Sequence, residues 1–152
     1  MNKILADMHT HTIASGHAYA TLTEMCKEAA NKGLEIYGIT EHSSGTPGTC
    51  ADIYFQNLRV VPRDLFGLDL RLGAEINIID YNGTLDLDQK YIDRLDFVIA
   101  GIHSVCYKFG SKEENTAAII NAIKNPNVNI ISHPDDGRCP LDYEALVQAA
   151  KE

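Results

Sequence analysis

Long apolar stretches are missing from this sequence, and no run approaches the roughly 20 residues that a membrane-spanning helix needs. Residues 1–5 are followed at once by Asp7 and two histidines, so the longer apolar core of a signal peptide is missing too. We therefore predict a cytoplasmic protein with no membrane partner.

Positive charge is also scarce, because 13 Lys and Arg stand against 21 Asp and Glu, which gives a formal net charge of −8. This acidic balance argues against nucleic-acid binding through bulk electrostatics. A small phosphorylated substrate stays open, since bound metal ions can reverse the sign of the local charge. The four cysteines form no C-x-x-C pair, and we expect reduced thiols.

No linker or low-complexity segment interrupts the chain, and its length fits one domain over residues 1–152. Short apolar runs alternate with helical patterns and begin roughly 25–35 residues apart, the size of a βα unit. Their near-continuous apolar character predicts parallel strands buried on both faces, and therefore an α/β fold. The runs cover residues 4–8, 36–40, 70–79, 97–102 and 128–132.

Helix signals lie between the apolar runs. Thr21 with Glu24 and Ser111 with Glu114 each match a capping box ahead of apolar residues at helical spacing. Residues 43–67 lack steady periodicity, and we predict a long loop there with short helical pieces. The predicted helices follow Thr21 as far as Gly33, follow Ser111 as far as Lys124, and cover residues 143–151.

Every apolar run carries, at or near its end, a residue that can bind a metal. In α/β barrels the C-terminal ends of the strands converge on one face, where catalytic groups lie. All six histidines of the chain belong to this set. The candidate ligands are His9, His11, His17, His42, Glu75, His103 and His133.

The spacing of His9 and His11 is itself informative, because residues two apart on a strand point to the same face and can hold one ion together. Imidazole nitrogens combined with carboxylate oxygens suit Zn²⁺, Mn²⁺ or Fe²⁺. The candidate ligands exceed the three or four of a single site, so we expect more than one metal, with Glu75 bridging two of them. Clustered metals suit phosphoryl chemistry, because they activate water and stabilise the attacking and leaving oxygens.

Residues beside the candidate ligands have their own interpretations. Asp7 is interpreted as a partner that orients a ligand histidine rather than as a ligand. Glu41 is either a helper at the strand end or a solvated charge. Cys106 and Cys139 are interpreted as small packing residues rather than thiolate ligands.

Six short motifs surround the candidate ligands. They are DMHTHT from residue 7, ASGHAY from residue 14, TEH from residue 40, GAE from residue 73, AGIH from residue 100 and ISHP from residue 131. Together they resemble the polymerase and histidinol phosphatase (PHP) family, and its small stand-alone bacterial phosphatases most of all. The resemblance runs from end to end of the chain and implies a distorted, TIM-like (β/α)7 barrel, a centre of up to three divalent metals and phosphoesterase activity.

The resemblance also implies which ligands share an ion. The sets are His9, His11 and bridging Glu75 for the first metal, Glu75, His103 and His133 for the second, and His17 with His42 for the third. Family members continue into two more strands, the last with an Asp-x-His motif that completes the first and third sets, and this motif is absent here. We therefore expect about five of the seven strands, the N-terminal portion of an incomplete barrel.

Three functions are compatible with these residues. We predict the first, a phosphoesterase that hydrolyses a phosphomonoester with hydroxide on a bound metal and no side-chain nucleophile. The second is a non-catalytic metal-binding remnant of the barrel. The third is a metal-dependent C–N hydrolase, which usually needs a barrel lysine or a late-strand aspartate, and no lysine ends a run here. Arg59 or Arg63 is predicted to bind the substrate phosphate through a bidentate fork, the alternative being two exposed loop charges.

The run at residues 128–132 is the last in the sequence, and its far edge would present unpaired N–H and C=O groups. We therefore expect the chain to self-associate as a homo-oligomer or to cover this edge with a rearranged segment. We also expect it to be less stable and less active than a version extended through the Asp-x-His strand.

Overall fold

The computed structural model of the protein describes residues 3–152. Its centre is a five-stranded sheet in which the strands are parallel and follow one another in chain order. This arrangement confirms the predicted α/β fold, since strands adjacent in the sequence are also adjacent in the sheet. The strands are β1 (Ala6–Asp7), β2 (Ile36–His42), β3 (Asp69–Asn77), β4 (Val98–Gly101) and β5 (Ile130–Ile131).

The two outer strands, β1 and β5, are shorter than predicted, with only two residues each. Within the described residues each has a neighbour on one side only, so fewer hydrogen bonds hold its ends. Their residues are exposed or half-buried, and the prediction of burial on both faces is wrong for these two strands. The inner strands β2, β3 and β4 are buried almost throughout, as predicted.

The helices lie between the strands along the chain. They are α1 (Leu22–Asn31), α2 (Ile53–Asn57), α3 (Gln89–Ile92), α4 (Lys112–Ile123) and α5 (Tyr143–Lys151), with the 3-10 turns η1 (Ile13–Ser15), η2 (Leu58–Val60) and η3 (Leu65–Gly67). Both predicted capping boxes are present, at the starts of α1 and α4. The long loop contains short helical pieces as predicted, whereas α3 was not predicted because a four-residue helix is too short to show a period.

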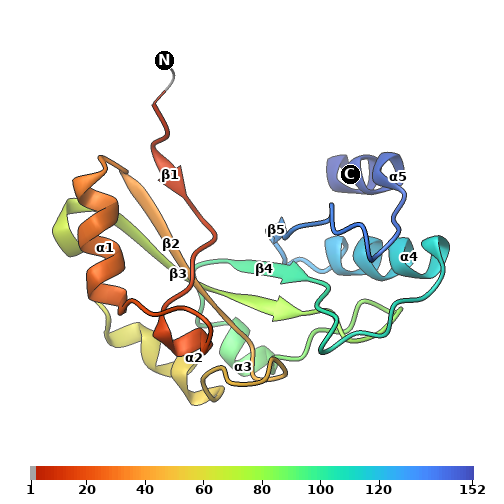
Figure 1. Ribbon diagram of the computed structural model, residues 1–152, viewed down its shortest axis with the longest axis horizontal. Helices are drawn as coiled ribbons and strands as arrows, with labels where there is room; N and C mark the ends of the chain where they lie inside the picture. Colours follow the sequence, from red (N-terminus) through yellow and green to blue (C-terminus); the bar gives the residue numbers. More distant parts are fainter. Residues whose placement is uncertain (1–2) are drawn as a thin grey trace.

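Two apolar clusters hold the helices against the sheet. The first packs α1, with Cys26 and Ala29, against β2 and β3. The second joins β4 to α4 and α5, and it buries Cys139 as the predicted packing residue. Figure 1 shows α1 on one side of the molecule and α4 with α5 on the other, with the inner strands between them. No helix in the described part of the chain is both long and apolar enough to cross a membrane.

Candidate metal centre

The C-terminal ends of the strands bring most of the predicted ligands to one edge of the sheet. His42 is the last residue of β2 and is paired in register with Glu75 of β3. His103 and His133 each lie two residues beyond the ends of β4 and β5. His133 has a positive φ of 27°, a strained conformation of the kind that gathers at functional sites.

The remaining candidate ligands of this edge, His9 and His11, lie on the segment that follows β1. This segment passes close to β2 because Gly38 has no side chain. A Cβ atom at Gly38 would lie 2.7 Å from the carbonyl oxygen of Met8. The glycine therefore allows the two histidines to reach the end of β3.

Glu75 is buried, and each of its carboxylate oxygens contacts the Nε2 atoms of a different pair of imidazoles. Its Oε2 lies 3.0 Å from Nε2 of His9 and 3.2 Å from Nε2 of His11, and those two nitrogens are 3.2 Å apart. Its Oε1 lies 3.2 Å from Nε2 of His103 and 2.9 Å from Nε2 of His133, and those two nitrogens are also 3.2 Å apart. Two triangles of ligand atoms therefore share one carboxylate.

The size of these triangles fits a divalent metal. Two donor atoms that each lie about 2.0–2.1 Å from a tetrahedral zinc ion are separated by about 3.3 Å. The edges of both triangles measure 2.9–3.2 Å, close to that separation. Facing nitrogen lone pairs repel one another unless a proton or a cation lies between them. Nitrogen and carboxylate donors at this spacing suit zinc and similar transition metals.

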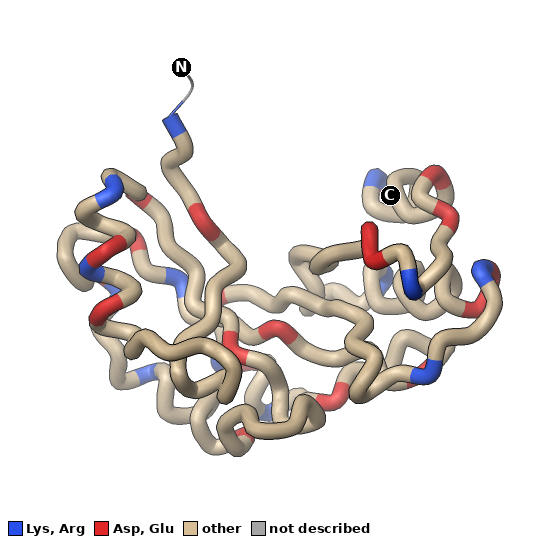
Figure 2. The backbone as a smooth tube through the Cα atoms, viewed as in Figure 1, with Lys and Arg blue, Asp and Glu red and all other residues tan. Residues whose placement is uncertain are grey.

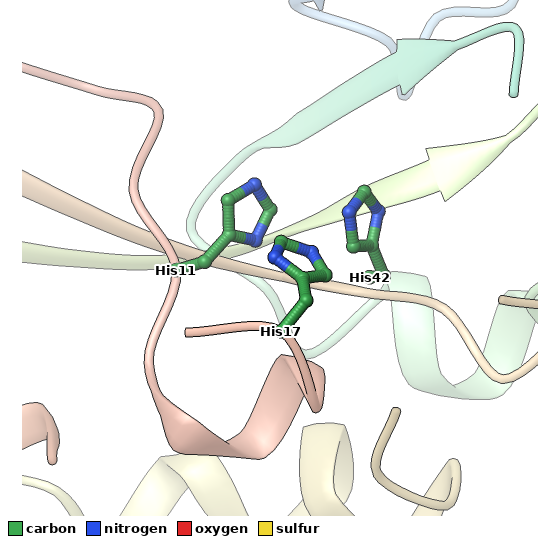
Figure 3. A group of neighbouring side chains, drawn as sticks. All are labelled: His11, His17 and His42. Carbon is green, nitrogen blue, oxygen red and sulfur yellow. The ribbon is translucent and has the colours of Figure 1, made fainter. Parts of the chain in front are cut away.

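A third group contains histidines alone, and Figure 3 shows its three rings turned toward one another. The ring centroids of His11 and His17 are 5.1 Å apart, those of His11 and His42 are 4.5 Å apart, and those of His17 and His42 are 4.9 Å apart. His42 also links this group to the first triangle, since its Nδ1 lies 3.1 Å from Oε2 of Glu75. The structure therefore brings together all seven residues that the sequence proposed as ligands.

Burial and hydrogen bonding shift the pKa values in the centre. Burial would raise the pKa of Glu75, but hydrogen bonds from His103, His11, His133 and His9 outweigh it and lower the pKa strongly. Burial lowers the pKa of His42 to about 3, against the opposing charge of Glu75. The hydrogen bond to Glu75 raises the pKa of His133. A charged Glu75 and a neutral His42 are the forms that bind a divalent cation.

Two acidic residues next to the candidate ligands, Glu41 and Asp7, lie in surroundings that differ from those predicted. Glu41 is fully buried, so its interpretation as a solvated charge is wrong. Its carboxylate accepts hydrogen bonds from Thr12 and Ser15. Asp7 accepts the main-chain N–H of His9 at 3.3 Å, and within residues 3–152 it makes no hydrogen bond to a histidine ring. β1 ends at Asp7, and its side chain accepts from the adjoining main chain instead of from the ring of a candidate ligand.

The two arginines predicted to bind phosphate are held away from the centre. The guanidinium of Arg63 pairs with Asp96, at 2.8 Å from Nε to Oδ2, and donates to the carbonyl oxygens of Leu58 and Val61. Asp96 lies just before β4, at the opposite end of the strands from Glu75. Arg59 is exposed and lines a separate pocket that contains none of the candidate ligands.

A different arginine lies beside the centre. A pocket of about 480 Å³ is lined by His103, His133 and Arg138, together with residues that include Asp136. Arg138 forms an ion pair with Asp136, at 2.6 Å from Nη2 to Oδ2. The sequence patterns did not point to Arg138, although its position shortly after the predicted ligand His133 was an available signal.

Two curated relatives, both called probable phosphatases, match nearly the whole chain. The relative from Acetivibrio thermocellus is 49% identical over 150 residues, which cover 99% of this chain and 62% of the relative. The relative from Caldicellulosiruptor saccharolyticus is 51% identical over 146 residues, which cover 96% of this chain and 61% of the relative. The chain therefore spans about three fifths of the length of these relatives.

A solved structure shares the fold. It is the histidinol phosphate phosphatase of Lactococcus lactis in complex with zinc, L-histidinol and phosphate. The TM-score is 0.51 at 20% identity, and the similarity covers 86% of this chain and 58% of that one. A sequence profile of the PHP domain matches residues 7–150. Since that match covers nearly all of the sequence, the chain belongs to the PHP domain family.

Proposed function

We propose that this protein is a metal-dependent phosphatase that hydrolyses a small phosphomonoester. The observation that carries the proposal is the pair of ligand triangles that share the carboxylate of Glu75. Membership of the PHP family and the names of the relatives support the phosphatase class.

Up to three divalent metals would be held by this centre, and its nitrogen and oxygen donors suit Zn²⁺, Mn²⁺ or Fe²⁺. When bound, such metals activate water and stabilise negative charge on phosphate oxygens. The side chains hold the ligand atoms at fixed spacing and keep the shared carboxylate out of water. The proposed sets are Glu75 with His9 and His11, Glu75 with His103 and His133, and His17 with His42.

The substrate phosphate would enter the pocket beside His103 and His133. Figure 2 shows Lys and Arg mainly on the outer helices and loops of the molecule. Arg138 is the only Lys or Arg among the described residues that line this pocket. A guanidinium group matches the geometry of phosphate oxygens, so we assign Arg138 the phosphate contact first expected of Arg59 or Arg63. The pocket volume of about 480 Å³ suits a small organic phosphate.

Metal content and turnover test the proposal. We expect protein purified without added metal to carry at least one transition metal per chain, and to hydrolyse a generic aryl phosphate. His103→Ala should remove both properties. Cys106→Ala is the matched control, because the Cys106 sulfur lies 3.9 Å from Oγ1 of Thr46 and belongs to none of the ligand groups among the described residues.

The outcomes separate the candidate functions. Bound metal without turnover of any phosphomonoester would favour a non-catalytic metal-binding protein. A folded protein without metal would contradict the proposal as a whole. Because the relatives are longer than this chain, the same measurements on one of them show whether the additional length changes metal content or turnover.

A further inference from the structure

Glu41 is a fully buried acid beside the ligand His42, and it belongs to none of the ligand groups in the described part of the chain. Its carboxylate accepts the main-chain N–H of Thr12 at 3.1 Å and the hydroxyl of Thr12 at 2.5 Å. It also accepts the hydroxyl of Ser15 at 2.5 Å. Both donors belong to the turn between His11 and His17, so Glu41 fixes the segment that carries these two candidate ligands.

The hydroxyl of Ser15 connects this carboxylate to a ligand. Besides Glu41, its oxygen lies 3.1 Å from the main-chain nitrogen of His42 and 3.0 Å from Nδ1 of His11. A hydroxyl has one proton to donate and two lone pairs to accept with. A carboxylate only accepts and a main-chain N–H only donates. If Ser15 gives its proton to Glu41, one of its lone pairs accepts the main-chain N–H of His42. The other lone pair is then left for His11.

A charged acceptor forms a stronger hydrogen bond than a neutral ring nitrogen, so Glu41 takes the proton of Ser15. The nitrogen Nδ1 of His11 is then the donor toward Ser15 when a cation, rather than the ring proton, lies between Nε2 and Glu75. A neutral imidazole has one N–H, so a proton on Nδ1 leaves a lone pair on Nε2. This Nε2 lies 3.2 Å from Oε2 of Glu75 and 3.2 Å from Nε2 of His9, at a corner of the first triangle.

We propose that Glu41, acting through Ser15, stabilises the tautomer of His11 that carries its proton on Nδ1, the form in which Nε2 can bind a metal. In the opposite tautomer, Nε2–H would donate to Glu75 and compete with the metal for that carboxylate. Glu41 and Ser15 are positioning residues that act on His11 from outside the ligand set. The inference rests on the metal-binding part of the proposed function and is independent of phosphatase activity.

The test compares two hydroxyl deletions in one turn. Ser15→Ala removes the acceptor of the Nδ1 proton. Thr12→Val is the matched control. Thr12 also donates its hydroxyl to Glu41, but among the described residues it makes no hydrogen bond to a histidine ring. Long-range ¹H–¹⁵N spectra of metal-free, histidine-labelled protein at mildly alkaline pH distinguish the two tautomers. We expect a larger share of the Nδ1–H form of His11 in the wild type and in Thr12→Val than in Ser15→Ala, because without metal Nε2 also faces the carboxylate of Glu75.

Zinc affinity, measured by competition with a chromophoric chelator, is the second readout. We expect Ser15→Ala to bind its first zinc about 10–100-fold more weakly than Thr12→Val. Thermal unfolding of both variants accounts for any general loss of packing. Equal tautomer populations of His11 in the two variants, or equal zinc affinities, would overturn the proposal. If Ser15→Ala does not fold, Ser15→Cys, which keeps the size of the side chain and weakens the acceptor, gives the same comparison. Loss of phosphatase activity alone would contradict the proposed function and not this inference.

Discussion

Five imidazole nitrogens lie within 3.2 Å of the two carboxylate oxygens of Glu75. A charge as deeply buried as this carboxylate carries a desolvation penalty on the order of several kcal/mol and needs polar partners. Each neutral imidazole has one N–H, yet the ring nitrogens also face each other in pairs at 3.2 Å. A cation in each triangle would satisfy the lone pairs and the carboxylate together, so both triangles depend on this one residue.

Glu75→Gln tests that dependence with the least change of shape. The amide has no negative charge, and one of its two ends is a donor instead of an acceptor. We expect metal affinity to fall by at least about 100-fold, since loss of a supporting partner alone costs about 10–100-fold. Chelator competition measures the change. Glu113→Gln, an exposed acid in the first turn of α4, is the control and should bind metal normally. Unchanged affinity in Glu75→Gln would show that Glu75 does not bridge.

Gly101 is a second residue on which the centre depends, for a steric reason. A Cβ atom there would lie 2.1 Å from Oγ of Ser132 and 3.3 Å from Cε1 of both His103 and His133. We expect Gly101→Ala to lower the free energy of unfolding by about 1–3 kcal/mol, as overpacking does, and to weaken metal binding at those two histidines. Urea unfolding and zinc titration measure the two effects. Gly137→Ala is the control because a Cβ at Gly137 meets nothing within 4 Å. Wild-type values in Gly101→Ala would rule out this close packing.

At the scale of elements, local signals predicted the helices well and the strands less well. The starts of α1 and α4 could be predicted because a capping box needs only residues three apart, such as Thr21 and Glu24. The lengths of β1 and β5 could not, since pairing with a neighbouring strand decides where a strand ends. The positions of the arginines could not be predicted for a similar reason, because the fold decides which loop approaches the centre.

We therefore expect the loop after β5, which carries Arg138, to bind phosphate in place of the segment around η2, which carries Arg59. We expect Arg138→Met to weaken the binding of inorganic phosphate to the zinc-loaded protein by about tenfold or more, as loss of one charge-assisted hydrogen bond does. Its zinc content should not change. Isothermal titration measures phosphate affinity without requiring turnover. Arg59→Met is the matched control, since Arg59 lines a separate pocket. A loss of affinity confined to Arg59→Met would return the phosphate contact to the segment first predicted.

At the scale of the whole molecule, the grouping of the candidate ligands could be predicted because a parallel sheet sends all its strand ends to one edge. The contacts around them could not. Glu41 has the same sequence context whether it is solvated or buried, and the turn that covers it with Thr12 and Ser15 belongs to another segment of the chain. The proposed ligands follow from topology, whereas the groups that orient them follow from packing.

The centre joins Glu75, within β3, to segments that follow β1, β4 and β5, so bound metal would act as a set of cross-links between distant parts of the chain. A ligand that binds only the folded state stabilises it by about 2.7 kcal/mol when its concentration is 100-fold above Kd. For a chain of this size, that corresponds to about 5–10 °C in Tm. The effect should be largest at β1 and β5, because these strands have the fewest paired residues of their own.

Removing the metals with a chelator therefore tests whether they stabilise the whole fold. We expect a chelator to lower Tm by about 5–10 °C and zinc to restore it. Hydrogen exchange should show β1 and β5 losing protection first, while the buried strands β2 and β3 keep theirs, because their apolar contacts do not involve the metals. Glu75→Gln should show little response to the chelator, since its metals are already lost. An unchanged Tm and uniform exchange after complete metal removal would mean that the sheet alone fixes the strand ends, with the ligands held in place before any metal binds.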